Sequence, residues 1–176
     1  MCLCAEITSI DCGVEIIVLR HTLEAKRNSN TGRLVARALT SARLVTYGAP
    51  NTPLETAVLT APGTALLFPR PSAIDAPPPS RVIVLDGSWS QARRMAQRIP
   101  QLRGMPSLSL PAPTRLLPRM REGKSPEQMS TAESAIAALR VLGEEKAAAH
   151  LESLLHELVR RFALPKRKGP MLSTRQ

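Results

Sequence analysis

The feature that most constrains the fold is an apolar run, "VIVL", at residues 82–85 within "RVIVLDGSWSQARRM". Its residues are all branched aliphatics, and no polar residue alternates with them. A strand with one solvated face alternates apolar and polar side chains, whereas a continuous apolar run is typical of a strand covered on both faces. The run therefore predicts an interior strand of a mostly parallel sheet with helices on both faces.

The rest of the chain repeats this alternation of strands and helices. Strands are predicted at residues 14–21, 64–69, 81–86 and 107–111, and helices at 31–44, 88–99 and 130–162, the last interrupted near Gly143. Within the last region we expect one apolar stripe to pack in the core: Leu151, Leu154, Leu155, Leu158 and Phe162. The alternation predicts a single α/β domain.

The length of 176 residues and the hydrophobic content of 43% suit one domain with a real core. We expect this domain to span residues 1–165, followed by a basic mobile tail at 166–176. No apolar run approaches the length needed to cross a bilayer. The first residues, "MCLCAEITSI", lack the pattern of a signal peptide, so a cytoplasmic location is expected.

The chain is strongly basic, with 24 Lys+Arg against 14 Asp+Glu and a formal charge of +10. This excess attracts polyanions and favours RNA or DNA as partner, although a host with an Arg-rich proteome would produce it too. Aromatic residues make up only 2%, which excludes an extended stacking platform. RNA contact is therefore expected from basic side chains: Arg93, Arg94, Arg115, Arg119, Arg121 and Lys124.

The polar residues after the run lie where parallel sheets bind ligands, outside the carboxyl ends of their strands. Asp86 could cap a turn, or it could orient or deprotonate a substrate nitrogen. Trp89, the only tryptophan, could anchor the core or form a pocket wall that accepts a cation such as a sulfonium. His21 and Glu24, after an earlier predicted strand, are minor candidates.

Two helix starts share the capping-box pattern, one at residues 88–91 and one at 130–133. Such a start can simply cap the helix, or its free N–H groups can hold a carboxylate or phosphate. The sequence lacks the Gly-rich nucleotide-binding motifs and the Gly-x-Ser-x-Gly elbow of hydrolases. The cysteines, Cys2, Cys4 and Cys12, are odd in number and do not indicate a disulfide framework.

Four segments, in order, resemble the motifs of the DTW-domain family between Cys2 and Leu139. "VLDGSWSQARRM" resembles its Asp-x-Thr-Trp motif, with Ser88 in place of Thr, and "MSTAES" its Ser-Thr-x-Glu-Ala element, with Ser134 in place of Ala. "LRHTLEAKRNSNTGRLVARAL" resembles its His-Pro-x-Glu…Asn-Thr-Gly-Arg-Leu block, with Thr22 in place of Pro, and "LLFP" its Leu-Phe/Tyr-Pro strand.

The resemblance implies an enzyme that moves the 3-amino-3-carboxypropyl group of S-adenosylmethionine to N3 of a tRNA uridine, releasing methylthioadenosine. It implies a SPOUT-like fold with a knotted C-terminal half, and no obligate protein partner. Catalytic roles fall on Asp86, Ser88 and Trp89, with Trp89 packing on the aminocarboxypropyl or sulfonium region. Cofactor contacts are expected from Leu67, Pro69, Leu85, Asp86, Gly87, Trp89, Leu110, Ser130 and Thr131.

The family commonly has a Cys-x-x-Cys before its Cys-x-Cys, whereas this sequence has only Cys2 and Cys4. Residues 1–12 are therefore interpreted as a remnant of a Cys-rich element, unless the chain starts downstream of the family's usual start. Zinc usually needs four ligands, so binding by Cys2 and Cys4 stays open. Two alternatives also stay open: a SPOUT-like RNA methyltransferase, and a non-catalytic basic protein that binds RNA or assists ribosome assembly.

Overall fold

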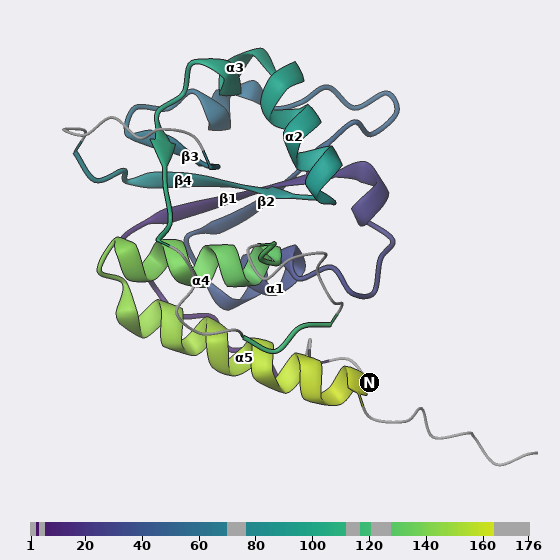
Figure 1. Cartoon of the computed structure of the whole chain (residues 1–176), viewed down its shortest axis with the longest axis vertical. Coiled ribbons are helices and arrows are strands. Elements are labelled where there is room, and N and C mark those ends of the chain that lie inside the picture. Colours follow the sequence, from purple (N-terminus) through teal and green to yellow (C-terminus); the bar gives the residue numbers. More distant parts are fainter. Residues whose placement is uncertain (1–2, 4–5, 70–76, 112–116, 121–127, 164–176) are drawn as a thin grey trace, which may run out of the picture.

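One sheet of five parallel strands forms the centre of the computed structural model, which describes residues 3, 6–69, 77–111, 117–120 and 128–163 (Figure 1). Its spatial order is β2-β1-β4-β3-β5. The strands are β1 (Glu15–His21), β2 (Ala42–Tyr47), β3 (Thr64–Leu67), β4 (Arg81–Asp86) and β5 (Ser107–Leu108). The apolar run of residues 82–85 lies in β4, an interior strand, as the sequence predicts.

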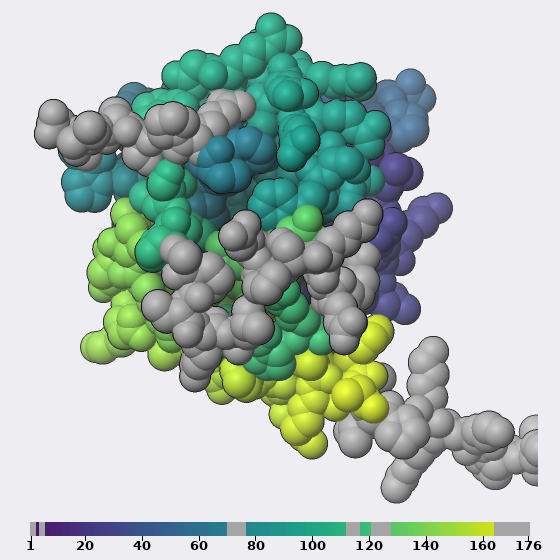
Figure 2. All heavy atoms as spheres, viewed as in Figure 1, coloured from purple at the N-terminus to yellow at the C-terminus, as the bar shows by residue number. Residues whose placement is uncertain are grey.

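Helices cover both faces of this sheet. One face carries α1 (Gly32–Ala38), α4 (Thr131–Val141) and α5 (Glu145–Ala163); the other carries η2 (Thr56–Leu59), α2 (Trp89–Arg98) and α3 (Pro100–Arg103) (Figure 1). In the space-filling view, the teal residues of α2 and α3 and the yellow-green residues of α5 lie at opposite ends of the molecule (Figure 2). The predicted α/β arrangement is confirmed.

The interior strands bury residues toward both helical layers, which explains their continuous apolar sequences. In β4, Val82 and Val84 pack toward α1, α4 and α5, whereas Ile83 packs toward α2, α3 and η2. All three side chains are at most 2% exposed. Because successive side chains of a strand point to opposite faces, a strand between two helical layers needs apolar residues at every position.

Two sequence-based predictions about the helices are wrong. The helix predicted at residues 31–44 ends at Ala38, because Leu39 has an extended backbone and β2 starts at Ala42. Leu44, which fitted the helical spacing, instead pairs with Val18 in the sheet, so tertiary pairing overrides local pattern here. In the predicted C-terminal stripe, Leu151 and Leu155 are buried and Leu154 and Leu158 pack against the core as predicted. Only Phe162 departs from the prediction, because it is 53% exposed.

The break predicted near Gly143 is confirmed. The φ angle of Gly143 is +81°, a left-handed conformation that glycine adopts without strain, and it separates α4 from α5. Among the helices in the described segments, none is both long and apolar enough to cross a bilayer. Pro100–Arg103, a short helix after α2, has no counterpart in the prediction.

The connections that leave β1 and β4 diverge at the middle of the sheet. From β1, α1 leads over one face to the neighbouring β2, whereas from β4, α2 leads over the opposite face toward β5. A parallel sheet forms a crevice outside the carboxyl ends of two strands whose connections diverge in this way. Asp86 and the segment that follows β1 therefore lie at the position where such sheets bind ligands.

Candidate active site

Asp86, the last residue of β4, joins three distant parts of the chain at this crevice. Its Oδ2 accepts a hydrogen bond from Asn30 Nδ2 at 2.6 Å, and its Oδ1 accepts one from Thr131 Oγ1 at 2.7 Å. Asn30 lies between β1 and α1, and Thr131 is the first residue of α4. Only 3% of Asp86 is exposed. The carboxylate therefore fixes the segment before α1 and the start of α4 against the end of β4.

Gly32 allows this close approach because it has no side chain. A Cβ added to it would lie 2.6 Å from Asp86 Oδ2 and 2.9 Å from a methyl carbon of Val18, both closer than real contacts. The neighbouring Thr31 ties the same segment to α4, since its Oγ1 accepts a hydrogen bond from the Ala132 amide at 3.2 Å. The Asn30–Thr31–Gly32 segment thus contacts both Asp86 and the start of α4.

The start of α4 carries the predicted capping box. The Ser130 amide donates to Glu133 Oε2 at 2.7 Å, and the Glu133 amide donates to Ser130 Oγ at 3.3 Å. Glu133 is 4% exposed, and its Oε1 accepts from Arg119 Nε at 3.0 Å. The Ala132 amide donates to Thr31 and the Glu133 amide donates to Ser130, so these two first-turn amides of α4 already have acceptors within the protein. The buried Glu133 carboxylate likewise already accepts from Ser130 and Arg119.

The start of α2 carries the second predicted capping box, in a more open setting. The Ser88 amide donates to Gln91 Oε1 at 2.7 Å, and the Gln91 amide donates to Ser88 Oγ at 3.3 Å. Ser88, Trp89 and Ser90 are exposed, Trp89 by 41%. Within the described part of the chain, the Trp89 and Ser90 amides have no hydrogen-bond acceptor, so they can donate to a ligand.

A cavity of about 1230 Å³ lies over these groups, at the carboxyl edge of the sheet. The structure places all nine sequence-predicted cofactor residues around it: Leu67, Pro69, Leu85, Asp86, Gly87, Trp89, Leu110, Ser130 and Thr131. Ser88, the remaining predicted catalytic residue, lines it as well. Residues of four chain segments far apart in sequence thus surround one cavity.

Several lining residues were missed by the sequence-based reasoning, chiefly Asn30 and Thr31, with Phe68 and Met120 on the apolar side. The Asn-Thr-Gly element of the family resemblance was the signal available for the first two. Glu24, a minor candidate, also lines the cavity; it is 2% exposed and forms an ion pair with Arg27 at 3.2 Å.

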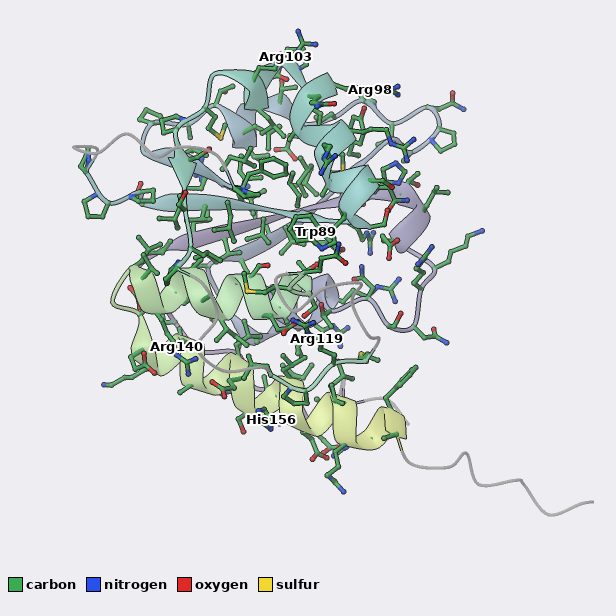
Figure 3. The ribbon with its side chains drawn as sticks, in the orientation of Figure 1. Trp89, Arg98, Arg103, Arg119, Arg140 and His156 are labelled. Carbon is green, nitrogen blue, oxygen red and sulfur yellow. The ribbon has the colours of Figure 1, made fainter. Side chains whose placement is uncertain are left out.

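The predicted RNA-binding residues occupy different environments. Arg93 lines the cavity, and Arg94 is exposed on α2, where its Nε donates to the Ser90 carbonyl. Arg119 also lines the cavity but pairs with the buried Glu133 (Figure 3). The other three lie outside the described residues: Arg115, Arg121 and Lys124.

His21 has a structural environment. Its Nδ1 accepts a hydrogen bond from the Leu23 amide, which caps the short helix η1 (Thr22–Glu24), and its ring meets Tyr47 edge-on at 6.1 Å. Cys2 and Cys4 lie outside the described residues. Among the residues that the structure describes, no group of three or more His, Cys, Asp or Glu side chains could hold a metal ion.

A half-buried cation, Arg20, pairs with Asp86 in the register of the sheet. Arg20 donates from Nη2 to Thr46 Oγ1 at 3.0 Å, and its buried Nε has no partner in the described structure. Burial lowers the pKa of the Arg20 guanidinium and nearby Arg33 lowers it further, whereas Asp86 opposes both effects. The negative charge of Asp86 therefore offsets part of the cost of burying Arg20.

The fold and cavity define an α/β protein with a cavity at the switch point of a parallel sheet. The DTW domain family model matches residues 1–163, so the chain belongs to the DTW-domain family, as its motifs indicate. This family is associated with tRNA-modifying transferase activity. No solved structure matches the chain.

Proposed function

We propose that this protein transfers the 3-amino-3-carboxypropyl group of S-adenosylmethionine to N3 of a uridine in tRNA and releases methylthioadenosine. One observation carries the proposal: residues of the family motifs meet at one cavity, with Asp86 bonded to both Asn30 and Thr131. Membership of a family of tRNA-modifying transferases and the charge of +10 agree with a tRNA substrate.

The residues present fit S-adenosylmethionine. The cavity volume of about 1230 Å³ is large for a small-molecule site, which leaves room for an acceptor nucleotide beside the cofactor. Apolar residues from the ends of β3 and β5, among them Leu67, Pro69 and Leu110, form a wall suited to the adenosine. The open amides of Trp89 and Ser90 at the start of α2 suit the amino-acid carboxylate.

The start of α4, which the sequence also predicts as a carboxylate site, is less suited to this role. The Ala132 and Glu133 amides already donate to Thr31 and Ser130. The buried Glu133 carboxylate also accepts from the Ser130 amide and from Arg119, so these donors are already used within the protein. We therefore assign Ser130 and Thr131 to the shape of the cavity and the carboxylate to α2.

Asp86 is proposed to position the site more than to take up the substrate proton. Each of its oxygens already accepts a short hydrogen bond, and the group is 3% exposed. Displacing Asn30 to reach a substrate proton would leave a buried donor unpaired, and displacing Thr131 would break the bond that holds the start of α4. Asp86 instead holds the three segments in the arrangement that the reaction needs.

Orientation is the main catalytic requirement in this proposal. S-adenosylmethionine supplies a carbon that its sulfonium already activates. The N3–carbon bond forms while the carbon–sulfur bond breaks, the sulfur keeps the electron pair, and the N3 proton passes to solvent water. Three carbons adjoin the sulfur, so the protein must present one of them to the uridine, which requires the rigid site that Asp86, Gly32 and Thr31 build.

The finer fold class belongs to the same proposal. After β5 at one edge of the sheet, the chain returns to β4 and β1, where Thr131 and Ala132 bond Asp86 and Thr31. This return suits a SPOUT-like fold with a knotted C-terminal half, although residues 112–116 and 121–127 of the connection lie outside the described segments. A tRNA-modifying role also agrees with the expectation of a cytoplasmic location and of action without an obligate protein partner.

The test is to incubate the purified protein with unmodified tRNA and S-adenosylmethionine and to analyse nucleosides and small products by mass spectrometry. We expect aminocarboxypropyl-uridine together with methylthioadenosine. A methylated nucleoside with S-adenosylhomocysteine would assign the same site to a methyltransferase. Binding of tRNA with neither product would favour the non-catalytic RNA-binding alternative.

A further inference from the structure

Trp89 is conspicuous because it is a large indole left 41% exposed, whereas Asp86 and Leu67 of the same cavity are buried. Asp86 is 3% exposed and Leu67 is 9% exposed. Trp89 is the first residue of α2 and lines the same cavity, so it lies on the solvent side of the site. Figure 3 shows it at the end of α2 nearest the sheet and α4, with Arg98 at the far end of the helix.

Arg93 lies one helical turn after Trp89 and also lines the cavity. Residues four apart on a helix are neighbours on one face, with Cβ atoms about 5–6 Å apart. Arg93 is exposed, and no ion pair or side-chain hydrogen bond holds it within the described part of the chain. The mouth of the cavity thus presents an aromatic face beside a guanidinium, the two groups that bind a nucleobase and a phosphate.

We propose that Trp89 stacks on the acceptor uracil and that Arg93 binds a phosphate next to it, an inference that rests on the proposed transfer to tRNA. A folded tRNA is too large to enter the cavity, so its target nucleotide must approach from solvent and meet the outermost residues first. Enzymes that modify a base usually bring it out of its stack, and an aromatic side chain then replaces the lost stacking.

This assignment differs from the sequence-based expectation that Trp89 packs on the sulfonium of the cofactor. An interaction between a cation and an aromatic face is strongest when both are removed from water. Trp89 is the most exposed large aromatic group in the site, whereas in the apolar wall Leu67 is buried and Leu85 and Leu110 are half-buried. A stacked base would itself cover the indole, so the exposure fits the acceptor side of the cavity.

The single tryptophan makes the proposal testable by fluorescence of the unmodified chain. We expect unmodified tRNA to quench Trp89 emission in a saturable way, and uridine 5′-monophosphate to do so at higher concentration. Ribose 5-phosphate, which lacks the base, should leave the emission unchanged. Saturable quenching by S-adenosylmethionine but not by tRNA or the nucleotide would place Trp89 on the cofactor and overturn the proposal.

Variants provide a second readout in the transfer assay. Trp89→Ala should raise the KM for tRNA about tenfold or more, with the affinity for S-adenosylmethionine nearly unchanged, and Trp89→Phe should restore most of the loss. A weakened affinity for S-adenosylmethionine with an unchanged KM for tRNA would contradict the assignment. If the wild-type chain transfers nothing to tRNA, the proposed reaction fails, and quenching by tRNA still decides the role of Trp89.

Arg93 has a matched control on its own helix. Arg98 is exposed in the last turn of α2 and does not line the cavity. Arg93→Gln should weaken tRNA binding several-fold and reduce the slope of log affinity against log salt by about 1, because one phosphate contact is lost. Arg98→Gln should change neither by a comparable amount. Equal effects of the two substitutions would reduce Arg93 to general surface charge and overturn its assignment.

Discussion

The starts of α2 and α4 have the same capping geometry and different surroundings. In both, the box bonds measure 2.7 Å and 3.3 Å, formed by Ser88 with Gln91 and by Ser130 with Glu133. At α4, however, Glu133 is buried and bonded to Arg119. At α2, the corresponding Gln91 is neutral, and Ser88, Trp89 and Ser90 are exposed beside the cavity.

This difference teaches that a capping box does not by itself identify a ligand site. Local bonds decide where a helix begins, but the groups around its first turn decide whether its amides remain available. At α4 the amides serve Thr31 and Ser130, and Thr131 holds Asp86. We therefore interpret the start of α4 as the rigid support of the site and the start of α2 as its ligand-facing side.

The largest expected effect is at Asp86, which supports the α4 side. Asp86→Ala removes the acceptor of both the buried Asn30 and the half-buried Thr131, and a buried donor left unpaired costs about 1–3 kcal/mol. We expect the free energy of unfolding to fall by about 3 kcal/mol and transfer to be lost, with tRNA affinity almost intact. Denaturant unfolding, the product assay and tRNA binding measure these three quantities.

Asp11 provides a control for this substitution. It is exposed, although it accepts a hydrogen bond from Thr40 Oγ1 at 2.6 Å, so Asp11→Ala should cost less than about 1 kcal/mol and leave transfer unchanged. Full activity in Asp86→Ala would show that the site does not depend on this carboxylate.

The next prediction distinguishes Arg119 from Arg94, both of which the sequence analysis predicts to contact RNA. Arg119→Gln removes the cationic partner of the buried Glu133, so, within the described part of the chain, the Glu133 carboxylate stays buried without an opposite charge beside it. We therefore expect the free energy of unfolding to fall by about 2–3 kcal/mol. Arg94→Gln, on the exposed face of α2, should change stability by less than about 0.5 kcal/mol.

Salt titrations of tRNA binding provide the second measure of this pair. Arg94→Gln should reduce the salt slope by about 1, whereas Arg119→Gln, if the pairing with Glu133 is its main role, should leave the slope unchanged. The reverse result, a stable Arg119→Gln protein with a reduced slope, would move Arg119 back among the RNA contacts.

A smaller effect is expected for Gly32→Ala, because Gly32 contributes only the space beside Asp86 that its missing side chain leaves free. Gly32→Ala places a methyl group 2.6 Å from Asp86 Oδ2, and the shift needed to relieve the clash should cost about 2 kcal/mol. Gly104→Ala is the matched control, because a Cβ there meets nothing within 4 Å and its φ is −101°. Equal thermal stability of the two variants would show that the segment before α1 tolerates displacement.

The smallest effect compares the two capping serines directly. Ser88→Ala and Ser130→Ala each remove one cap, which costs about 1 kcal/mol of stability. Because only the α2 side faces the cofactor in our proposal, Ser88→Ala should also weaken binding of S-adenosylmethionine more than Ser130→Ala does. Calorimetric titration of both variants measures this, and a stronger loss in Ser130→Ala would exchange the two roles.

Much of the fold could be predicted from the sequence because strong local patterns carry it. The strand at residues 81–86, the break at Gly143 and both capping boxes depend on residues close together in the chain. β2 could not be predicted, because Leu44 fits a helical spacing and becomes a strand residue only by pairing with β1. Phe162 fits the apolar stripe but lies near the end of α5, where it is exposed.

The candidate site also has a part that local sequence patterns predict and a part that depends on long-range contacts. Asp86, Ser88 and Trp89 could be identified because they follow an unmistakable strand. The contacts of Asp86 with Asn30 and Thr131 span 56 and 45 residues, and the bond between Thr31 and Ala132 spans 101. No local pattern specifies such pairings, so the contacts on which the proposed positioning role of Asp86 rests could be found only in the structure.

The most direct test of the proposed reaction is to follow which part of S-adenosylmethionine reaches tRNA. Two preparations of S-adenosylmethionine, one labelled in the carboxyl carbon and one in the methyl group, would be incubated separately with the protein and unmodified tRNA. We expect the carboxyl label to appear in the tRNA and the methyl label to stay with released methylthioadenosine. Methyl label in the tRNA without carboxyl label would contradict aminocarboxypropyl transfer.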